Sequence, residues 1–543
     1  MTAPALATDS VTSTTRSQAR QARATLRTER RWAWGSGGLA ALATAIIAAP
    51  GLNNEFFRDE AVTADVAART PGQVVDLLGT IDVGHALLYS LVSVLPIDSA
   101  SPWQVRLVSL LPVMAAGAIL AVWSSISLGR LAGVLVALTW PLLPATVGVG
   151  LYARDYGLAT LFAVLSTLAL VVGLMRPNSS EGLARRVWWG YTTALVLMVY
   201  SNLFALFLLP AHAVAIVLLR RERRDALVAW AKSSCIAVAA CLPLVVSVAR
   251  QPDPISWVAP PLLRDLVIIP NRILGGSGYG TNEAPAGAAV FSVLLLALCT
   301  WAVVRTLRAW LHDREQQDIV GVTVVVATAW LLVPVVCSVL VSLERPVFVA
   351  RYLWFVAPAV VLLLATLPRS TNMAAGVQPD EGQTLTLRRF IARWGWVAAV
   401  PLVVLVAGAG PRAGLLATQG EVDYRGVVTY LSAEARTGDV IVSDDPSYNF
   451  LRSGLESAAG GALPVRDVLV ARTGVERGDI PAEEFPEEAW GPLLAGSERV
   501  WVVANAGDQP GPRESAAQAG RERVEDRRFD GLILRLYTSG RAN

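Results

Sequence analysis

Two adjacent acids follow the first long apolar segment of the chain and could carry out acid–base chemistry. Asp59 and Glu60 stand in the stretch Glu55-Phe56-Phe57-Arg58-Asp59-Glu60. A carboxylate in such a place can act as general base on a hydroxyl group, while its neighbour orients a substrate or a metal ion. The alternative is a structural helix cap with aromatic anchors at the membrane interface. The residues alone leave both interpretations open, with Arg58 as an adjoining candidate for substrate binding.

A second polar group opens the next apolar segment. Asp82 and His85 precede Tyr89 in the stretch Asp82-Val83-Gly84-His85-Ala86-Leu87-Leu88-Tyr89. His85 and Tyr89 are four residues apart and therefore share one face of a helix. The alternative is that His85 only caps or fills this helix. Because Asp82 is so close, we expect all three residues to line a substrate site.

Two arginines at the ends of later apolar segments could bind an anion. Arg154 and Tyr156 lie between two segments, and Arg351 and Tyr352 begin another. The planar guanidinium group donates paired hydrogen bonds that match a phosphate. The alternatives are a local ion pair between Arg154 and Asp155, and an interfacial arginine at position 351 whose head reaches out of the membrane.

The composition predicts helices that span a membrane. Hydrophobic residues make up 54% of the 543 residues, the mean hydropathy is +0.48, and only 16% of the residues are charged, against about 25% in soluble domains. Long apolar runs indicate about twelve spans within residues 32–410, with a first outer loop at 53–82. The fold class is therefore a mostly α, polytopic membrane protein.

Basic residues set the expected topology. Arginines are concentrated in residues 1–31, which predicts a cytoplasmic N-terminal segment rather than a nucleic-acid-binding one. Three later loops are also basic and are expected in the cytoplasm, which agrees with a cytoplasmic N-terminus. They cover residues 220–224, 305–314 and 369–393. A single lysine, Lys232, among many arginines indicates a GC-rich, actinobacterial genome. We therefore expect a multi-pass protein of a bacterial plasma membrane, with membrane lipids around it.

The chain changes character after residue 410. Residues 411–543 are charged and rich in Pro and Gly, and the pattern predicts a small extracytoplasmic α/β domain. We expect helices over 423–436 and 515–525, and short buried strands over 439–443, 499–504 and 531–537. The four cysteines all lie in apolar segments without metal-ligand spacing, so the sequence predicts neither a disulfide framework nor a zinc site.

The order and spacing of these motifs resemble a known family. Arg58-Asp59-Glu60, then Gly84-His85-Ala86-Leu87-Leu88-Tyr89, then Arg154 with Tyr156, and then Arg351-Tyr352-Leu353 look like bacterial protein O-mannosyltransferases and aminoarabinose transferases of the GT-C fold. In the tail, Asp423-Tyr424-Arg425-Gly426 and Gly438–Val442 look like the actinobacterial branch. The chain departs from the family at Tyr152, where members often carry an acid or an amide.

The resemblance implies an activity and roles for these residues. It implies transfer of a sugar, mannose by analogy, from a polyprenyl-phosphate donor to a hydroxyl of a glycan, glycolipid or protein. Asp59 would be the catalytic base, Glu60 would orient the acceptor or help bind a divalent metal, and Arg351 would hold the phosphate, with Arg154 as second candidate. The alternative function is a transporter or flippase of a lipid-linked saccharide.

Overall fold

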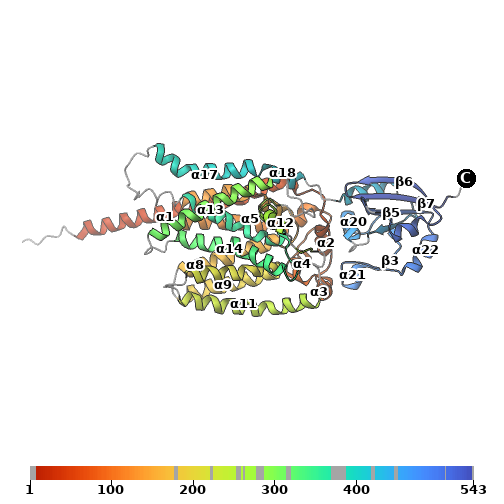
Figure 1. The fold of residues 1–543 in the computed structure, drawn as a ribbon, viewed down its shortest axis with the longest axis horizontal. Helices are drawn as coiled ribbons and strands as arrows, with labels where there is room; N and C mark the ends of the chain where they lie inside the picture. Colours follow the sequence, from red (N-terminus) through yellow and green to blue (C-terminus); the bar gives the residue numbers. More distant parts are fainter. Residues whose placement is uncertain are drawn as a thin grey trace, which may run out of the picture.

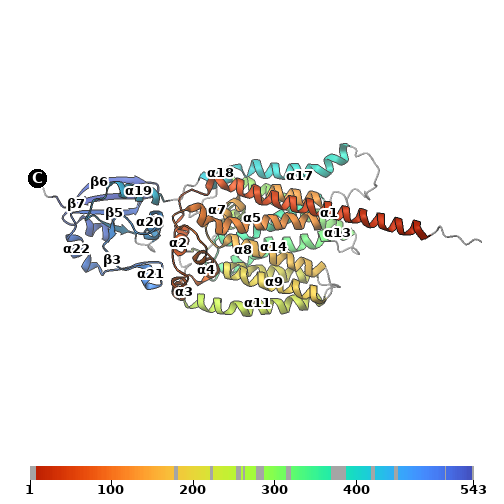
Figure 2. The ribbon, with the colours of Figure 1, turned by 180° about the vertical axis from the view of Figure 1, so that it is seen from behind.

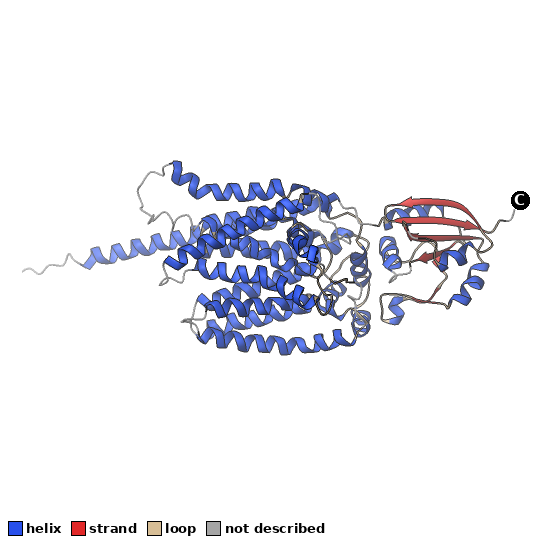
Figure 3. Cartoon of the chain, viewed as in Figure 1, coloured by secondary structure: helices blue, strands red, loops and turns tan. Residues whose placement is uncertain are grey.

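The computed structural model describes most of the chain and divides it into a helical bundle and a small α/β domain. It describes residues 8–175, 181–219, 224–251, 258–260, 263–276, 287–312, 319–368, 387–417, 422–445, 450–507 and 509–540. Among these described residues, strands occur only in the C-terminal domain, which lies beyond one end of the bundle (Figure 3). We call this end of the bundle, where α2, α3 and α4 lie, the domain-facing end (Figure 1).

Long apolar helices form the bundle, as the hydropathy predicts. Six described helices are long and apolar enough to cross a membrane, and there are up to eight if each of two bent pairs is one span. The expected number of about twelve spans thus stays a prediction, because several further helices are shorter. The long helices are α1 (Thr8–Ala48), α5 (Pro102–Ser127), α8 (Tyr156–Met175), α9 (Glu181–Ser201), α11 (Arg224–Arg250), α13 (Ala288–His312), α14 (Ile319–Ser342) and α17 (Leu387–Ala407).

Shorter helices connect these and build the domain-facing end. α4 has only nine residues, or about 13 Å of helix, which is less than half of a bilayer core. Of the apolar segments that the sequence predicts as spans, the one at α4 is therefore too short to be a full span. The shorter helices are α2 (Arg58–Ala67), α3 (Pro71–Thr80), η2 (Val83–His85), α4 (Ala86–Val94), η4 (Leu203–Phe207), α10 (Leu208–Leu219), α12 (Leu263–Leu274), η6 (Ala350–Val356) and α15 (Ala357–Ala365), with η1 (Ala49–Gly51) after α1.

Two bent helix pairs are joined by one buried arginine. α6 (Arg130–Thr139) with η3 (Trp140–Leu142) meets α7 (Pro144–Leu151) at 60°, and α17 meets α18 (Ala409–Ala417) at 50°. Arg412 of α18 donates hydrogen bonds to the carbonyl oxygens of Leu142 at 2.6 Å and Val404 at 2.9 Å. Because a bend leaves backbone carbonyls without helical partners, this side chain stabilises both breaks in an apolar surrounding.

The C-terminal domain is built on a five-stranded sheet in the order β2-β1-β5-β7-β6. β1 pairs in parallel with β2 and β5, with Val442 opposite Val502, whereas β7 is antiparallel to β5 and β6. A separate two-stranded sheet pairs β3 with β4. The strands are β1 (Val440–Asp444), β2 (Arg466–Asp467), β3 (Val470–Arg472), β4 (Glu483–Glu484), β5 (Arg499–Asn505), β6 (Glu522–Phe529) and β7 (Leu532–Thr538).

The sequence predicts three strands and one helix of this domain correctly and makes one error. The three expected strands appear as β1, β5 and β7, and the first expected helix is α19 (Tyr424–Glu434), which Asp423 caps through Gly426 N–H at 2.8 Å. The expected helix over 515–525 is wrong beyond its first turn, because residues 522–529 form β6. The helices here are α19, α20 (Phe450–Ala459), α21 (Gly474–Arg477), α22 (Glu487–Ala495) and α23 (Pro512–Gln518).

Helix α20 docks the C-terminal domain onto helix α2 of the bundle (Figure 2). Leu451 and Leu455 of α20 share one hydrophobic cluster with Ala61 and Ala64 of α2. Ser457 also donates a hydrogen bond to the Ala61 carbonyl at 3.5 Å. Helix α2, which carries Asp59 in its first turn, is therefore packed between the bundle and the C-terminal domain.

Candidate functional site

Helix α2 presents its first turn at the domain-facing end of the bundle. It begins at Arg58, so that Asp59 and Glu60 both lie in its first turn. Acidic residues favour this position because the helix N-terminus carries a partial positive charge. Glu60 also accepts a hydrogen bond from the Phe57 N–H at 3.0 Å, which is one half of a capping box. The interpretation as a cap is thus correct for Glu60.

Asp59 points into a polar site with one carboxylate oxygen held and the other available. Its Oδ2 accepts a hydrogen bond from the Tyr152 hydroxyl at 2.7 Å and lies 3.5 Å from Nη2 of Arg351. Within the described part of the chain, Oδ1 accepts no hydrogen bond, and 25% of the side chain stays exposed. Burial opposes the charged form, but the charges of Arg351 and Arg154 outweigh it and lower the pKa of Asp59 below its ordinary value.

Arg351 lies in an aromatic surrounding next to Asp59. It belongs to the 3-10 helix η6, and 12% of its side chain is exposed. Its guanidinium group lies 5.5 Å from the centre of the Tyr352 ring. Tyr156 stacks on Tyr152 at 5.6 Å. The structure therefore brings Arg351, Tyr352 and Tyr156 to the same site as Asp59, although they lie far apart in the sequence.

Arg154 is held by the protein on two sides. Its Nη2 lies 2.7 Å from Nε2 of His85, and its Nη1 donates to the Tyr89 hydroxyl and to the Asp59 carbonyl, both at 3.3 Å. His85 in turn lies 2.8 Å from Oδ2 of Asp155. The local ion pair between Arg154 and Asp155, left open from the sequence, does not form. Asp155 was not among the predicted site residues, although its position beside Arg154 was a signal.

Asp82 has a left-handed backbone conformation, which residues other than glycine adopt only uncommonly. Its φ of 56° is the only positive φ of a non-glycine residue among those the structure describes. Its Oδ2 accepts a hydrogen bond from the Tyr89 hydroxyl at 3.0 Å. Gln251 holds the chain on both sides, because it accepts from Val83 N–H at 3.0 Å and donates to the Leu78 carbonyl at 2.8 Å. Such strain persists where the surroundings fix it, and it often occurs at functional sites.

Glu60 lies outside this polar site, in a buried ion pair with Arg106. Arg106 donates to its Oε1 at 3.0 Å and its Oε2 at 2.8 Å, and the Ala153 N–H donates to Oε1 at 2.8 Å. The residue is 1% exposed. In this arrangement Glu60 has no oxygen left for an acceptor or a metal ion. The sequence reasoning missed Arg106, although an arginine inside an apolar segment is a recognisable signal.

Arg106 closes the loop between the first span and α2. Besides Glu60, it donates hydrogen bonds at 2.8–3.0 Å to the carbonyl oxygens of Gly51, Leu52, Asn54 and Glu55. Of the predicted site residues, Arg58 also points elsewhere, because its Nη2 lies 3.5 Å from Oδ1 of Asn505 in the C-terminal domain. The remaining predicted residues lie around Asp59.

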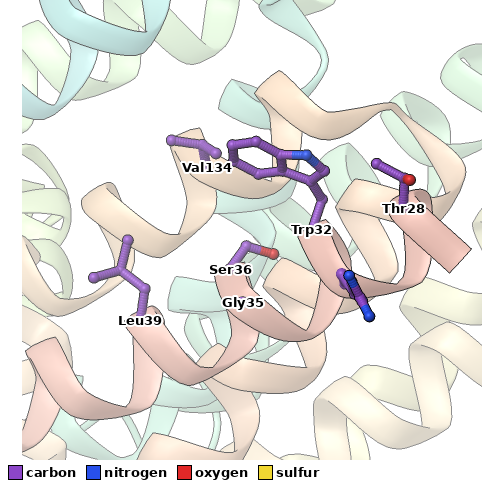
Figure 4. A pocket seen from close by; sticks show the side chains of 7 residues that line it. Thr28, Trp32, Gly35, Ser36, Leu39 and Val134 are labelled. Atoms are coloured by element: carbon purple, nitrogen blue, oxygen red, sulfur yellow. The ribbon is translucent and has the colours of Figure 1, made fainter.

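A cavity of about 450 Å³ lies away from Asp59, against the N-terminal half of the membrane-spanning part of α1. Its lining includes Arg31, Trp32, Ser36 and Val134, and Figure 4 shows Trp32 directed towards Val134. It contains an arginine and hydroxyl groups but no carboxylate, so it lacks a general base. Among the described residues, no group of three or more His, Cys, Asp or Glu side chains is placed to hold a metal ion.

Comparisons with known proteins identify the fold. No protein-family model matches the chain, and no curated protein matches it. Two solved structures of ArnT from Cupriavidus metallidurans are similar, one bound to undecaprenyl phosphate and one in the apo state. Both have a TM-score of 0.55 and 12% sequence identity; the first covers 93% of this chain and 98% of ArnT, and the second covers 92% and 97%. The chain therefore has the fold of these structures, the GT-C fold.

Proposed function

We propose that the protein is a membrane glycosyltransferase that moves a sugar from a polyprenyl-phosphate donor to a hydroxyl group of an acceptor. The observation that carries the proposal is the pairing at the domain-facing end of the bundle. Asp59 has one oxygen without a hydrogen bond from the described residues, and Arg351 lies 3.5 Å from the other. A base and a phosphate-binding cation are the two groups that this transfer requires.

The transfer would be a single displacement. Oδ1 of Asp59 takes the proton of the acceptor hydroxyl while that oxygen bonds to the anomeric carbon of the sugar. The bond between this carbon and the phosphate oxygen breaks, and the lipid phosphate leaves as an anion beside Arg351. One base suffices, because the phosphate leaves without being protonated, unlike the leaving group in most glycosidases. The configuration at the anomeric carbon is inverted.

The donor class has support from the fold comparison. One of the similar ArnT structures is bound to undecaprenyl phosphate, which is a polyprenyl phosphate. Mannose as the sugar rests on the family resemblance of the sequence motifs, and the acceptor is a glycan, a glycolipid or a protein hydroxyl. We place the reaction on the outer face of a bacterial plasma membrane, with the N-terminus in the cytoplasm, following the basic N-terminal residues.

The other residues divide into two groups. Asp82, Tyr156 and Tyr352 line the site around Asp59 and are the proposed contacts to the sugar. Tyr89 is fully buried and positions Asp82 and Arg154 through its hydroxyl group. Glu60 acts instead as a positioning residue, because its ion pair with Arg106 fixes the first turn of α2. No step is assigned to a divalent metal.

The alternative function is transport of a lipid-linked saccharide. Transporters commonly bind their substrates near the middle of the bilayer, at broken helices. The acidic and basic groups around Asp59 instead lie on or next to short elements at the domain-facing end, α2, η2 and η6, and in the loop that precedes α8. This placement favours the enzyme.

The experiment that tests the function follows transfer of label. Purified protein in detergent receives radiolabelled polyprenyl-phosphate mannose and an extract of host membranes, with Asp59→Asn as the matched variant. We expect transfer by the wild type and none by the variant, with both proteins monodisperse. Transfer that persists in Asp59→Asn would exclude Asp59 as the base. Absence of transfer by the wild type with several lipid-linked sugars would favour the transporter.

A further inference from the structure

Both ring nitrogens of His85 are occupied by the protein itself. Nε2 lies 2.7 Å from Nη2 of Arg154, and Nδ1 lies 2.8 Å from Oδ2 of Asp155. The histidine is 23% exposed, whereas Asp155 is 2% exposed. His85 therefore has no nitrogen left to bind a sugar, although its place in the site had suggested that role.

While both contacts are made, they are compatible with only one protonation state of His85. A guanidinium group can donate hydrogen bonds but cannot accept them, so Nε2 must be the acceptor. A neutral imidazole then carries its proton on Nδ1 and donates it to the carboxylate of Asp155. The hydrogen bonds run in one direction, from Arg154 through His85 to Asp155.

This arrangement fixes the guanidinium group of Arg154 beside the proposed base. His85 accepts from Nη2, while Nη1 donates to Tyr89 and to the backbone carbonyl of Asp59. We propose that His85 is a positioning residue: as the neutral Nδ1–H tautomer it holds Arg154 against the first turn of α2, and protonation of its ring releases Arg154.

Protonation of the ring conflicts with the contact to Arg154. An imidazolium group would direct an N–H at the guanidinium group, at a separation of 2.7 Å and with like charge. The nearby carboxylates would stabilise the imidazolium. Protonation would therefore break the contact with Arg154 without unfolding the protein. Arg154 and Asp155 contact the ring directly, and Tyr89 lies beside it with 5.6 Å between ring centres. The charge of Asp59 acts on the ring from nearby, and Asp82 is linked to it through the Tyr89 hydroxyl.

The proposal predicts which group limits the reaction in mild acid. Histidine is the side chain that normally changes charge between roughly pH 5 and 8. Asp59 cannot cause a loss of activity there, because its pKa lies below the ordinary value of an aspartate. Glu456, whose pKa is raised to about 7, also changes charge in this range, so only a fall in transfer rate that disappears in a non-titrating variant at position 85 would report His85.

The first test reads the tautomer directly and requires no activity. The chain has three histidines, so nitrogen NMR of protein labelled with ¹⁵N-histidine gives few signals, and His85→Gln identifies those of His85. We expect the Nδ1–H tautomer in the resting protein above neutral pH, and an unchanged His212 as internal control. An Nε2–H tautomer, or an imidazolium at that pH, would overturn the proposal.

The second test uses the pH dependence of transfer and rests on the proposed function. A glutamine at position 85 can accept from Arg154 and donate to Asp155 but does not titrate, whereas phenylalanine can do neither. We expect His85→Phe to lower the transfer rate by about 10–100-fold, the loss of a hydrogen bond to a charged group. We expect a smaller loss of transfer rate in His85→Gln. We also expect this variant to lack the acid limb of the wild type, which is the fall in transfer rate towards acidic pH.

The outcomes separate the two proposals. An acid limb that is the same in His85→Gln and in the wild type would overturn the role of His85 while leaving the transferase intact. If the wild type transfers no sugar at all, the proposed function fails, and the NMR measurement still decides whether His85 holds Arg154 as the neutral tautomer.

Discussion

Two faces of helix α2 carry neighbouring carboxylates in opposite surroundings. Asp59 faces tyrosines and arginines, keeps one oxygen free of hydrogen bonds from the described residues, and is 25% exposed. Glu60, about 100° further around the helix, is 1% exposed and accepts hydrogen bonds on both oxygens. The chemical type of the residues is the same, so the surroundings determine which of them can take a proton and which can only stabilise the fold.

The two carboxylates also differ in how accessible they are. Asp59 stays 25% exposed at the domain-facing end, whereas Glu60 is enclosed by Arg106, Ala153 and the start of α2. The C-terminal domain packs against α2 through α20, on Ala61 and Ala64. We infer that the Glu60 face holds the helix in place so that the Asp59 face keeps its geometry.

The largest expected effect separates activity from stability at Asp59. In Asp59→Asn, we expect the transfer rate to fall by ~10²–10⁴-fold, which is the usual contribution of a general base. Thermal unfolding in detergent should change little, because the amide can still accept a hydrogen bond from Tyr152. A large fall in the unfolding temperature would mean that Asp59, like Glu60, is mainly structural.

The converse is expected on the other face. Removing one partner of a buried ion pair commonly costs about 3–5 kcal/mol of unfolding free energy, so Glu60→Gln should unfold at a clearly lower temperature. The double variant Glu60→Gln with Arg106→Gln should lose less than the sum of the single variants, because neither charge is left unpaired. Strict additivity in unfolding measurements would show that the two residues do not interact as the structure indicates.

A smaller effect is expected at Arg351. In Arg351→Gln the phosphate of the donor loses a charged hydrogen-bond donor, commonly worth about 1.5–3 kcal/mol. We expect the donor KM to rise by roughly 10–100-fold, as measured with the donor varied at saturating acceptor. Arg130→Gln is a suitable control, because Arg130 pairs with Glu29 on an exposed surface. An equal effect in both variants would argue against a phosphate site at Arg351.

The sequence predicts Asp59 better than Glu60, for a physical reason. An acidic pair beside an apolar segment indicates function because charged groups are energetically unfavourable next to a membrane. The pattern does not say which of the two acids faces the substrate. That depends on contacts with Arg106 and Ala153, which lie 46 and 93 residues away. Gln251, 168 residues from Val83, was equally unpredictable, because nothing local marks its contacts.

The tail shows the same limit in its secondary structure. Buried strands such as β5 and β7 were predictable because their apolar residues are continuous. Strand β6, by contrast, reads ERVEDRRF, lies at the edge of the sheet and is exposed over most of its length. Without an apolar face it lacks the alternation that identifies a strand, so only its pairing with β7 determines its conformation.

The smallest expected effect concerns how firmly the C-terminal domain holds α2. Desolvation at the junction and the negative charge of Asp65 raise the pKa of Glu456, on α20, from 4.5 to about 7. Burial also raises the pKa of Asp65, on α2, despite the charge of Arg69. The docked state therefore binds protons more tightly than the undocked one, and docking should be strongest in acid and weaken as the pH rises through about 7.

Hydrogen exchange of the α20 amides between about pH 6 and 8 measures this coupling. Because exchange itself depends on pH, the wild type is compared with Glu456→Gln at each pH. We expect protection in the wild type to fall relative to the variant as the pH rises, since only the wild type gains a charge next to Asp65. A constant ratio would mean that this carboxylate has no influence on docking, and that the hydrophobic contacts of α20 hold the α2 helix alone.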